Sequence, residues 1–167
     1  KIGVPHIRLN HLRREINIRN DLKAVSEIKS LIKEFRPDTL FLNSSKAGFV
    51  GSLAFRLIRS KLPKTKVIYR IGGWTFNDPW PVWKKKFWVN LERQSARWKD
   101  TIIVNNEHDY TQAEKLKIKP RKNLVLIHNG LDIYKTEFLP GEDARLKLFE
   151  RIFKHSDNLP ADGQEYF

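Results

Sequence analysis

The sequence predicts an α/β fold in which helices flank a parallel sheet. Short apolar runs, each the length of one strand, alternate along the chain with longer segments whose apolar residues recur at helical spacing. The run 124–127 is apolar at four consecutive positions, which is typical of a strand buried on both faces. Alternation of this kind indicates right-handed strand–helix–strand units, and therefore a Rossmann-like parallel sheet.

Each expected element has a local signal. The segment 21–35 carries apolar residues at helical spacing after Asn20 or Asp21 as a cap, and Pro37 ends it. Pro81 suits the first turn of a helix, where its missing N–H costs nothing. The expected strands are 39–42, 66–69, 101–104 and 124–127, and the expected helices are 21–35, 47–60, 81–98, 106–116 and 144–153.

Composition excludes several classes of protein. The chain of 167 residues is long enough for one domain with a sizeable core, and it contains no cysteine, which excludes disulfides, thiolate metal sites and a cysteine nucleophile. No uncharged apolar run is long enough to span a bilayer, and no signal peptide is visible. Because the chain contains no methionine, we expect a piece of a longer protein or a processed product.

The formal net charge of +13 predicts an affinity for anions. The candidate partners are nucleic acid, anionic lipid headgroups and phosphorylated small molecules. A solvated basic surface without a dedicated partner is the alternative.

Polar clusters follow the expected strands, at the place where open α/β sheets bind ligands. The first cluster contains Asn43, Ser44, Ser45 and Lys46, followed by Gly48. One serine can cap the next helix. Lys46 opposes the positive end of that helix, so it either helps to hold an anion there or extends into water.

The second cluster is Gly72-Gly73-Trp74. Two glycines let the backbone approach a ligand or adopt positive φ. Trp74 is either a stacking platform for a sugar or a base, or an anchor of the core.

The third cluster contains Asn105, Asn106 and Glu107, and helix capping explains much of it. His108 and His128 follow different strands and could share a cleft. No histidine spacing indicates a metal site, so we expect none.

The last cluster, His128-Asn129-Gly130, closes the strand 124–127 and is followed by Leu131 and Asp132. Asn-Gly is a strong turn dipeptide, so a simple turn is the first interpretation. A ligand-binding loop is the second.

An aromatic and cationic segment begins the helix expected at 81–98. Its aromatic residues either pack in the core with the lysines outside, or enter a membrane surface while the lysines meet anionic headgroups. The membrane-facing candidates are Trp80, Trp83, Lys84, Lys85, Lys86 and Phe87.

Taken together, residues 42–48, 72–76, 103–108 and 125–132 resemble glycosyltransferase family 4 in their order and spacing, within about residues 35–135. Members are retaining enzymes of the GT-B architecture, with two facing Rossmann-like domains, that move a sugar from a nucleotide-sugar donor to an acceptor. The resemblance implies that this chain is most of the amino-terminal, acceptor-side half. It implies no metal or other cofactor.

The resemblance also implies a division of labour. Residues 1–140 would form the partial acceptor-side domain, and residues 141–167 a helix and linker toward an absent donor-binding domain. The isolated chain is therefore expected to be inactive. Members often have histidine where this chain has Gly72, which puts the usual arrangement of the cleft in doubt.

The resemblance places the cleft at the strand ends. The net charge of +13 and the aromatic and cationic segment 80–88 predict a cytoplasmic protein that docks on the inner face of the membrane. A lipid-linked or polysaccharide acceptor is expected. The alternatives are a non-catalytic basic domain that binds nucleic acid or anionic glycans, and an inactive sugar-binding relative. The expected cleft residues are Asn43, Ser44, Ser45, Lys46, Gly48, Gly72, Gly73, Trp74, Asn105, Glu107, His128, Asn129 and Gly130.

Overall fold

The computed structural model describes residues 6–13, 15–130 and 138–153. It divides into two compact units, residues 1–129 and residues 130–167. Two short 3-10 helices, η1 (Arg59–Lys61) and η2 (Thr75–Asn77), connect larger elements. The helices and strands are α1 (Ile18–Phe35), β1 (Thr39–Asn43), α2 (Ser45–Arg56), β2 (Lys66–Arg70), α3 (Val82–Ala96), β3 (Thr101–Val104), α4 (Glu107–Lys115), β4 (Asn123–Leu126) and α5 (Gly141–Phe153).

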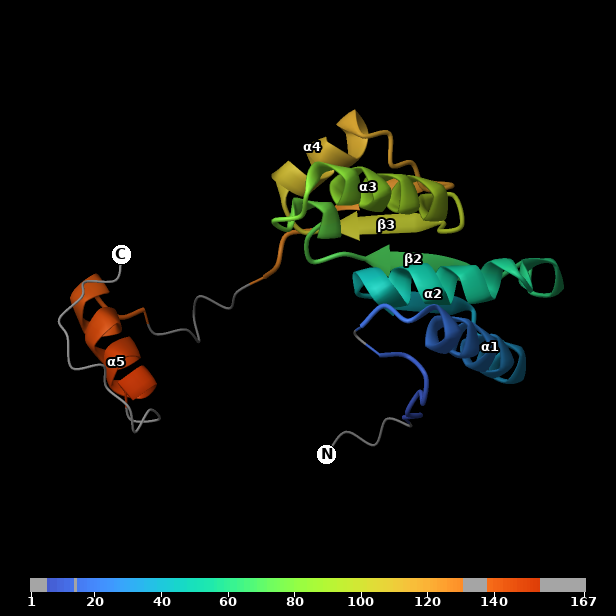
Figure 1. Cartoon of the computed structure of the whole chain (residues 1–167), viewed down its shortest axis with the longest axis horizontal. Coiled ribbons are helices and arrows are strands. Elements are labelled where there is room, and N and C mark those ends of the chain that lie inside the picture. The colour runs from blue at the N-terminus through green and yellow to red at the C-terminus, as the bar shows by residue number, and fades with distance from the viewer. Residues whose placement is uncertain (1–5, 14, 131–137, 154–167) are drawn as a thin grey trace. The chain divides into compact units, whose positions relative to one another are not determined.

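The predicted fold class is confirmed. The four strands form one parallel sheet in the order β1-β2-β3-β4. Its two central strands, β2 and β3, lie side by side in Figure 1. Each crossover moves one strand in the same direction, so right-handed connections place α2, α3 and α4 on the same face. Side chains alternate across β2 and β3, and those that face the helices are fully buried; they include Val67, Tyr69, Ile102 and Val104.

The expectation that residues 124–127 are buried on both faces is wrong. β4 is only half-buried, and Ile127 lies beyond it and is exposed. Phe41 of β1, on the same face of the sheet as Ile127, is also exposed. Within the described residues of the first unit, α2, α3 and α4 lie on the opposite face of the sheet, which leaves the side chains of Phe41 and Ile127 exposed.

α1 begins one turn earlier than predicted. Its cap is Asn17, whose side-chain oxygen accepts a hydrogen bond of 3.1 Å from the N–H of Asn20. The carboxylate of Asp21 accepts one of 3.3 Å from the N–H of Asn17. The side chains of Asn17 and Asp21 thus satisfy two backbone N–H groups at the start of the helix, in the manner of a capping box, and Asn20 lies inside the first turn.

Gly48 is a packing residue of the core. A Cβ at this position would lie 2.4 Å from Cε2 of Tyr69, so only glycine lets α2 approach β2 this closely. The glycine is itself buried. The prediction that Gly48 lines the cleft is therefore wrong.

A buried charged network lies between β2 and α3. The ammonium of Lys99, which is 0% exposed, lies 3.5 Å from Oε2 of Glu92 and donates to Oγ of Ser95 at 2.8 Å. The hydroxyl of Tyr69 donates to the other carboxylate oxygen of Glu92 at 3.2 Å. Burial lowers the pKa of Lys99, and Glu92 opposes that shift. Burial raises the pKa of Tyr69 well above 10.0, and the charge of Glu92 adds to the shift.

Ionisation of Tyr69 is expected to lower the stability of the fold at alkaline pH. Because its pKa is raised on folding, its contribution is complete below the unfolded pKa of about 10 and is lost as the pH rises above that value. In Tyr69→Phe, the free energy of unfolding is expected to fall less steeply above pH 10 than in the wild type, as urea titrations at several pH values would measure. The matched control, Tyr110→Phe, keeps the wild-type slope; equal slopes in Tyr69→Phe and the wild type would contradict the assignment.

The second unit contains α5, close to the helix predicted at 144–153. Glu142 and Asp143 lie in its first turn, where acidic side chains complement the helix dipole. The structure divides the chain after Asn129, earlier than the predicted boundary at residues 140–141. Residues 154–167 of the predicted linker lie outside the described residues, as do Leu131 and Asp132.

Candidate active site at the carboxyl edge of the sheet

Arg70 ties together three chain segments at the carboxyl edge. It is the last residue of β2, and it faces away from the side on which Tyr69 is buried. One terminal nitrogen donates to Oδ1 of Asn43 at 3.2 Å, and the other to Oδ1 of Asn129 at 2.7 Å. Asn43 ends β1 and Asn129 follows β4, so the loop after β4 returns over the end of β3 to reach β2.

The charge of Arg70 is not neutralised within the described part of the chain, where no carboxylate forms an ion pair with it. Its two partners are neutral amides, and two of its five N–H groups are used. A half-buried guanidinium with free donors is suited to bind a planar or tetrahedral anion, above all a phosphate group.

Sequence reasoning missed Arg70, although a signal was present. In the run Lys66 to Arg70 the side chains alternate between the two faces of the strand, and Arg70 is a cation at the end of that run, two residues before a glycine pair. A charged residue at the carboxyl end of a buried parallel strand points to the crevice.

A second polar contact joins the first two clusters. Oγ1 of Thr75 donates to Oγ of Ser45 at 2.9 Å, which links the start of α2 to η2. Ser44 is the cap of α2, and its hydroxyl accepts from the N–H of Ala47 at 3.2 Å. The capping role predicted for a serine is confirmed for Ser44, while Thr75 was not anticipated.

Lys46 is occupied by partners within the chain. Its ammonium lies 2.8 Å from Oδ1 of Asp21 and donates to the backbone carbonyl of Glu15. An internal carboxylate therefore compensates the cation at the positive end of α2, and the position needs no external anion.

Trp74 is an anchor of the core, the second of its two interpretations. Its side chain is 1% exposed and stacks on Phe76, with ring centroids 5.5 Å apart. Its indole N–H donates to the carbonyl of Asp109 at 2.9 Å. A sugar could not reach this ring without unfolding the loop.

The third cluster caps α4. Oδ1 of Asn106 accepts from the N–H of Asp109 at 2.8 Å, and its amide nitrogen donates to Oδ1 of Asn105 at 3.0 Å. Glu107 occupies the first turn and is exposed. Asn105 follows β3 and is half-buried, and it lies on the same side of the sheet as Arg70.

The cleft glycines leave open space. A Cβ at Gly72, Gly73 or Gly130 would meet no atom within 4 Å, and none of the described glycines has positive φ. The backbone therefore does not demand glycine at these positions. The missing side chains instead leave room beside Arg70 and at the loop that contains exposed His128.

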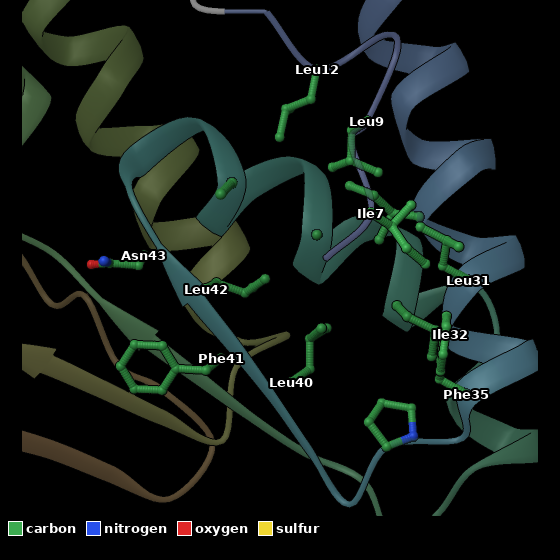
Figure 2. Close-up of a pocket in the computed structure, with 14 residues that line it drawn as sticks. Ile7, Leu9, Leu12, Leu31, Ile32, Phe35, Leu40, Phe41, Leu42 and Asn43 are labelled. Atoms are coloured by element: carbon green, nitrogen blue, oxygen red, sulfur yellow. The ribbon is translucent and has the colours of Figure 1, made fainter. Parts of the chain in front are cut away.

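A hollow with a mostly apolar lining lies beside the cluster. It has a volume of about 360 Å³ and lies between the amino-terminal segment, α1 and β1 (Figure 2). Its apolar lining includes Leu9 of the amino-terminal segment, Leu31 of α1 and Leu40 of β1. Asn43 lies at one end of the hollow. Asn43 is thus shared between the hollow and the Arg70 cluster.

In the described residues, no group of three or more histidine or acidic side chains could hold a metal ion.

The aromatic segment of α3 is divided between core and solvent. Trp88 packs against the core, but Trp83 is 71% exposed and Phe87 54% exposed, so the core interpretation is wrong for these two. Trp80 is half-buried, and the ammonium of Lys84 lies 3.3 Å from the centroid of its ring. Lys85 and Lys86 are exposed.

Comparison with known proteins places this arrangement in a family. The family model described as "Glycosyl transferase 4-like domain" matches residues 1–130, which include the whole Arg70 cluster. The chain belongs to the glycosyl transferase 4-like family. The resemblance seen in the strand-end motifs is thereby confirmed, as is the α/β architecture.

This glycosyl transferase 4-like chain is similar to two curated proteins. A Klebsiella pneumoniae protein named "Uncharacterized 41.2 kDa protein in cps region" is 34% identical over 72% of this chain and 31% of its own length. The Escherichia coli protein named "UDP-Gal:alpha-D-GlcNAc-diphosphoundecaprenol alpha-1,3-galactosyltransferase" is 28% identical over 73% of this chain and 30% of its own length. The chain thus spans about a third of the length of these relatives. None of its described helices is both long and apolar enough to cross a membrane.

Proposed function

We propose that this chain is the acceptor-side half of a retaining glycosyltransferase that transfers a sugar from a nucleotide-sugar donor to a lipid-linked, diphosphate-bearing acceptor. The observation that carries the proposal is the Arg70 cluster, an unneutralised guanidinium at the carboxyl edge of a glycosyl transferase 4-like domain. The named acceptor of the Escherichia coli relative contains a diphosphate, which supports an anionic acceptor here.

The proposed reaction exchanges one bond at the anomeric carbon. A hydroxyl oxygen of the acceptor forms a bond to that carbon as the bond from the carbon to the donor's diphosphate oxygen breaks. The hydroxyl proton leaves with the nucleoside diphosphate, and the new bond keeps the configuration of the old one. The developing charge on the leaving diphosphate needs preorganised donors, which we assign to a donor-binding half outside these 167 residues.

Within this chain, the proposed role is to bind and orient the acceptor. Arg70 binds a phosphate oxygen with its free N–H groups, while Asn43 and Asn129 fix the plane of the guanidinium. The open space at Gly72 and Gly73 admits the acceptor sugar. The exposed loop at His128 faces the transferred sugar. The proposed location is the cytoplasm, at the inner face of the membrane, where a lipid-linked acceptor lies.

Binding and turnover by the isolated chain test this division of labour. Calorimetric titration should detect a soluble, short-chain analogue of a prenyl diphosphate-linked sugar, with a Kd at least about tenfold lower than that of UDP-galactose. The same preparation should not transfer sugar to the analogue. Turnover by the chain alone would contradict the proposed halves, and a tighter complex with UDP-galactose would assign the chain to the donor instead.

Retention is tested in a complemented reaction. The chain is fused to the part of the Escherichia coli relative that follows its matched region, and the anomeric configuration of the product is read by nuclear magnetic resonance. A product with the donor's configuration is expected. A product of opposite configuration would remove retention from the proposal.

A further inference from the structure

The outer side of α3 and its carboxyl-terminal cap carry a stripe of exposed side chains. Trp83, Lys86, Asn90 and Arg97 follow one another at intervals of three, four and seven residues, which places them on one side of the helix. The stripe is about 21 Å long, from the helical rise of 1.5 Å per residue. It is aromatic at its first turns and basic at its end.

The aromatic end exposes an unusual amount of apolar surface for one helix turn. Val82 is exposed, as are Trp83 and Phe87. Clustered apolar residues of this size on a soluble surface mark an interaction site, whereas isolated ones do not. Lys85 and Lys86 lie between them in sequence and are exposed.

The basic end is a hollow that only cations line. It has a volume of about 540 Å³ and receives side chains from the end of α3, from the end of α4 and from the segment that follows α4. Within the described residues, no carboxylate forms an ion pair with any of its members. The lining residues are Arg93, Arg97, Lys115, Lys117 and Lys119.

A hydrogen bond from a side chain of the hollow to the backbone keeps the two helix ends, and therefore their cations, close to one another despite the repulsion between like charges. Nε of Arg93 donates to the carbonyl of Leu116 at 3.0 Å, which fastens α3 to the end of α4. Lys117 has φ of 54°, in the left-handed region that ends helices, and non-glycine residues adopt it at a cost. A fold that fixes like charges around one hollow is suited to bind several anionic groups at once.

We propose that the outer side of α3, together with this basic hollow, docks the protein on an anionic phospholipid surface. Trp83 and Phe87 enter the interface beside the headgroups, and the hollow receives lipid phosphates. The proposal rests on the proposed function in one respect only, namely that the acceptor lies in a membrane.

The pairing of aromatic and basic ends favours a bilayer over nucleic acid. A polyanion alone would satisfy the hollow but would leave Val82 and Phe87 in water. A bilayer interface satisfies both, because it takes apolar side chains a short distance below a layer of anionic headgroups.

The docked orientation has a consequence for the candidate active site. α3 follows η2, which comes after the carboxyl end of β2, and ends shortly before β3 begins. Its aromatic end therefore belongs to the edge of the sheet that carries Arg70. An acceptor whose diphosphate lies at headgroup level would then reach Arg70 without leaving the membrane.

Co-sedimentation of the 167-residue chain with vesicles tests the proposal. The chain should bind vesicles of equal parts phosphatidylglycerol and phosphatidylcholine at low salt, and bind phosphatidylcholine alone weakly. The triple variant Arg97→Gln, Lys115→Gln, Lys119→Gln should lower the partition coefficient at least about tenfold, since each cation contributes roughly fivefold. The double variant Trp83→Gln, Phe87→Gln should lower it at least about fivefold.

Matched controls distinguish the effect of the site from the effects of net charge and of exposed apolar surface elsewhere. Lys23→Gln, Lys33→Gln, Lys64→Gln removes the same charge from exposed positions elsewhere, and Ile18→Gln, Leu57→Gln removes exposed apolar side chains elsewhere. Both should retain partition coefficients within about twofold of the wild type. Circular dichroism confirms that each variant folds.

Three outcomes would overturn the proposal. The first is equal loss in the charge control and the hollow variant, which would indicate a diffuse basic surface. The second is equal binding to neutral and anionic vesicles. The third is preferential binding of an RNA homopolymer that the hollow variant abolishes, since the hollow would then be a nucleic-acid site. The hollow variant should lose vesicle binding but still bind the soluble acceptor analogue. This result distinguishes the docking proposal from the proposed function, because each can fail without the other.

Discussion

Replacing Glu92 by glutamine is expected to lower the free energy of unfolding by about 3–5 kcal/mol at neutral pH, because it leaves a buried cation without its counter-charge. Lys99 is 0% exposed, and its ammonium lies 3.5 Å from the Glu92 carboxylate. The remaining contacts of the ammonium are Oγ of Ser95 and the ring of Tyr69, whose centroid is 4.3 Å away. Neither carries a negative charge.

The pH dependence of the loss identifies Lys99 as its cause. Burial already lowers the pKa of Lys99, and Glu92 is the group that raises it. In Glu92→Gln this pKa falls further, so the variant releases the buried proton at a lower pH than the wild type. The deficit in stability should therefore shrink as the pH rises from the Lys99 pKa of the variant toward that of the wild type.

A second substitution distinguishes charge from packing. Adding Lys99→Met to Glu92→Gln removes the unpaired ammonium and keeps an apolar side chain of similar length, so most of the loss should be recovered. Urea denaturation of both variants at neutral and alkaline pH gives the comparison. The control Glu114→Gln, on the exposed side of α4, should change stability by no more than about 0.5 kcal/mol. A double variant as unstable as the single one would show that the unpaired ammonium is not the cause of the loss.

The fold could be predicted from the sequence because its signals are local and repeated. Four apolar runs at strand length, separated by segments of helical period, leave few arrangements besides a parallel sheet. The burial of β4 was mispredicted for a physical reason. An apolar run such as 124–127 indicates that a strand can be buried on both faces, but not that both layers of helices are present.

The candidate site was predicted in position but not in its central residue. The carboxyl ends of parallel strands meet at one edge, so Asn43 and Asn129 were placed in the same region. Arg70 was overlooked because no one-dimensional pattern shows which strand-end cation bridges the others. Conversely, the sequence allowed Lys46 and Trp74 to bind a ligand. In the structure Lys46 instead forms an ion pair with Asp21, and Trp74 is buried in the core.

The remaining strand-end residues show why glycine is ambiguous in a sequence. Gly48 and Gly72 follow neighbouring strands and were both assigned to the cleft. A Cβ at Gly48 would lie 2.4 Å from Tyr69, while one at Gly72 would meet nothing within 4 Å. One glycine permits packing and the other leaves space, and only the neighbouring element decides between the two.

Replacing Arg70 by glutamine is expected to weaken binding of the diphosphate-bearing acceptor analogue by about 30- to 100-fold, with little effect on folding. The free N–H groups of Arg70 would form charge-assisted hydrogen bonds to phosphate, each of which contributes about 1.5–3 kcal/mol. Glutamine keeps a hydrogen-bond donor for Asn43 or Asn129 but removes the charge. Arg70→Lys should recover only part of the affinity, because an ammonium cannot donate to both amides and a phosphate in one plane.

The choice of controls makes this prediction specific to the carboxyl edge. Arg97→Gln removes the same charge from the end of α3 and should leave binding of the soluble analogue unchanged in the absence of vesicles. Asn129→Ala removes one of the two acceptors that orient the guanidinium, so it should weaken binding several-fold while the charge remains. If Arg97→Gln and Arg70→Gln weakened binding equally, the anion would respond to the net charge of the chain. A loss confined to Arg70 and Asn129 would mean that the loop after β4 and the end of β2 bind the acceptor as one unit, and this is the arrangement that their hydrogen bond implies.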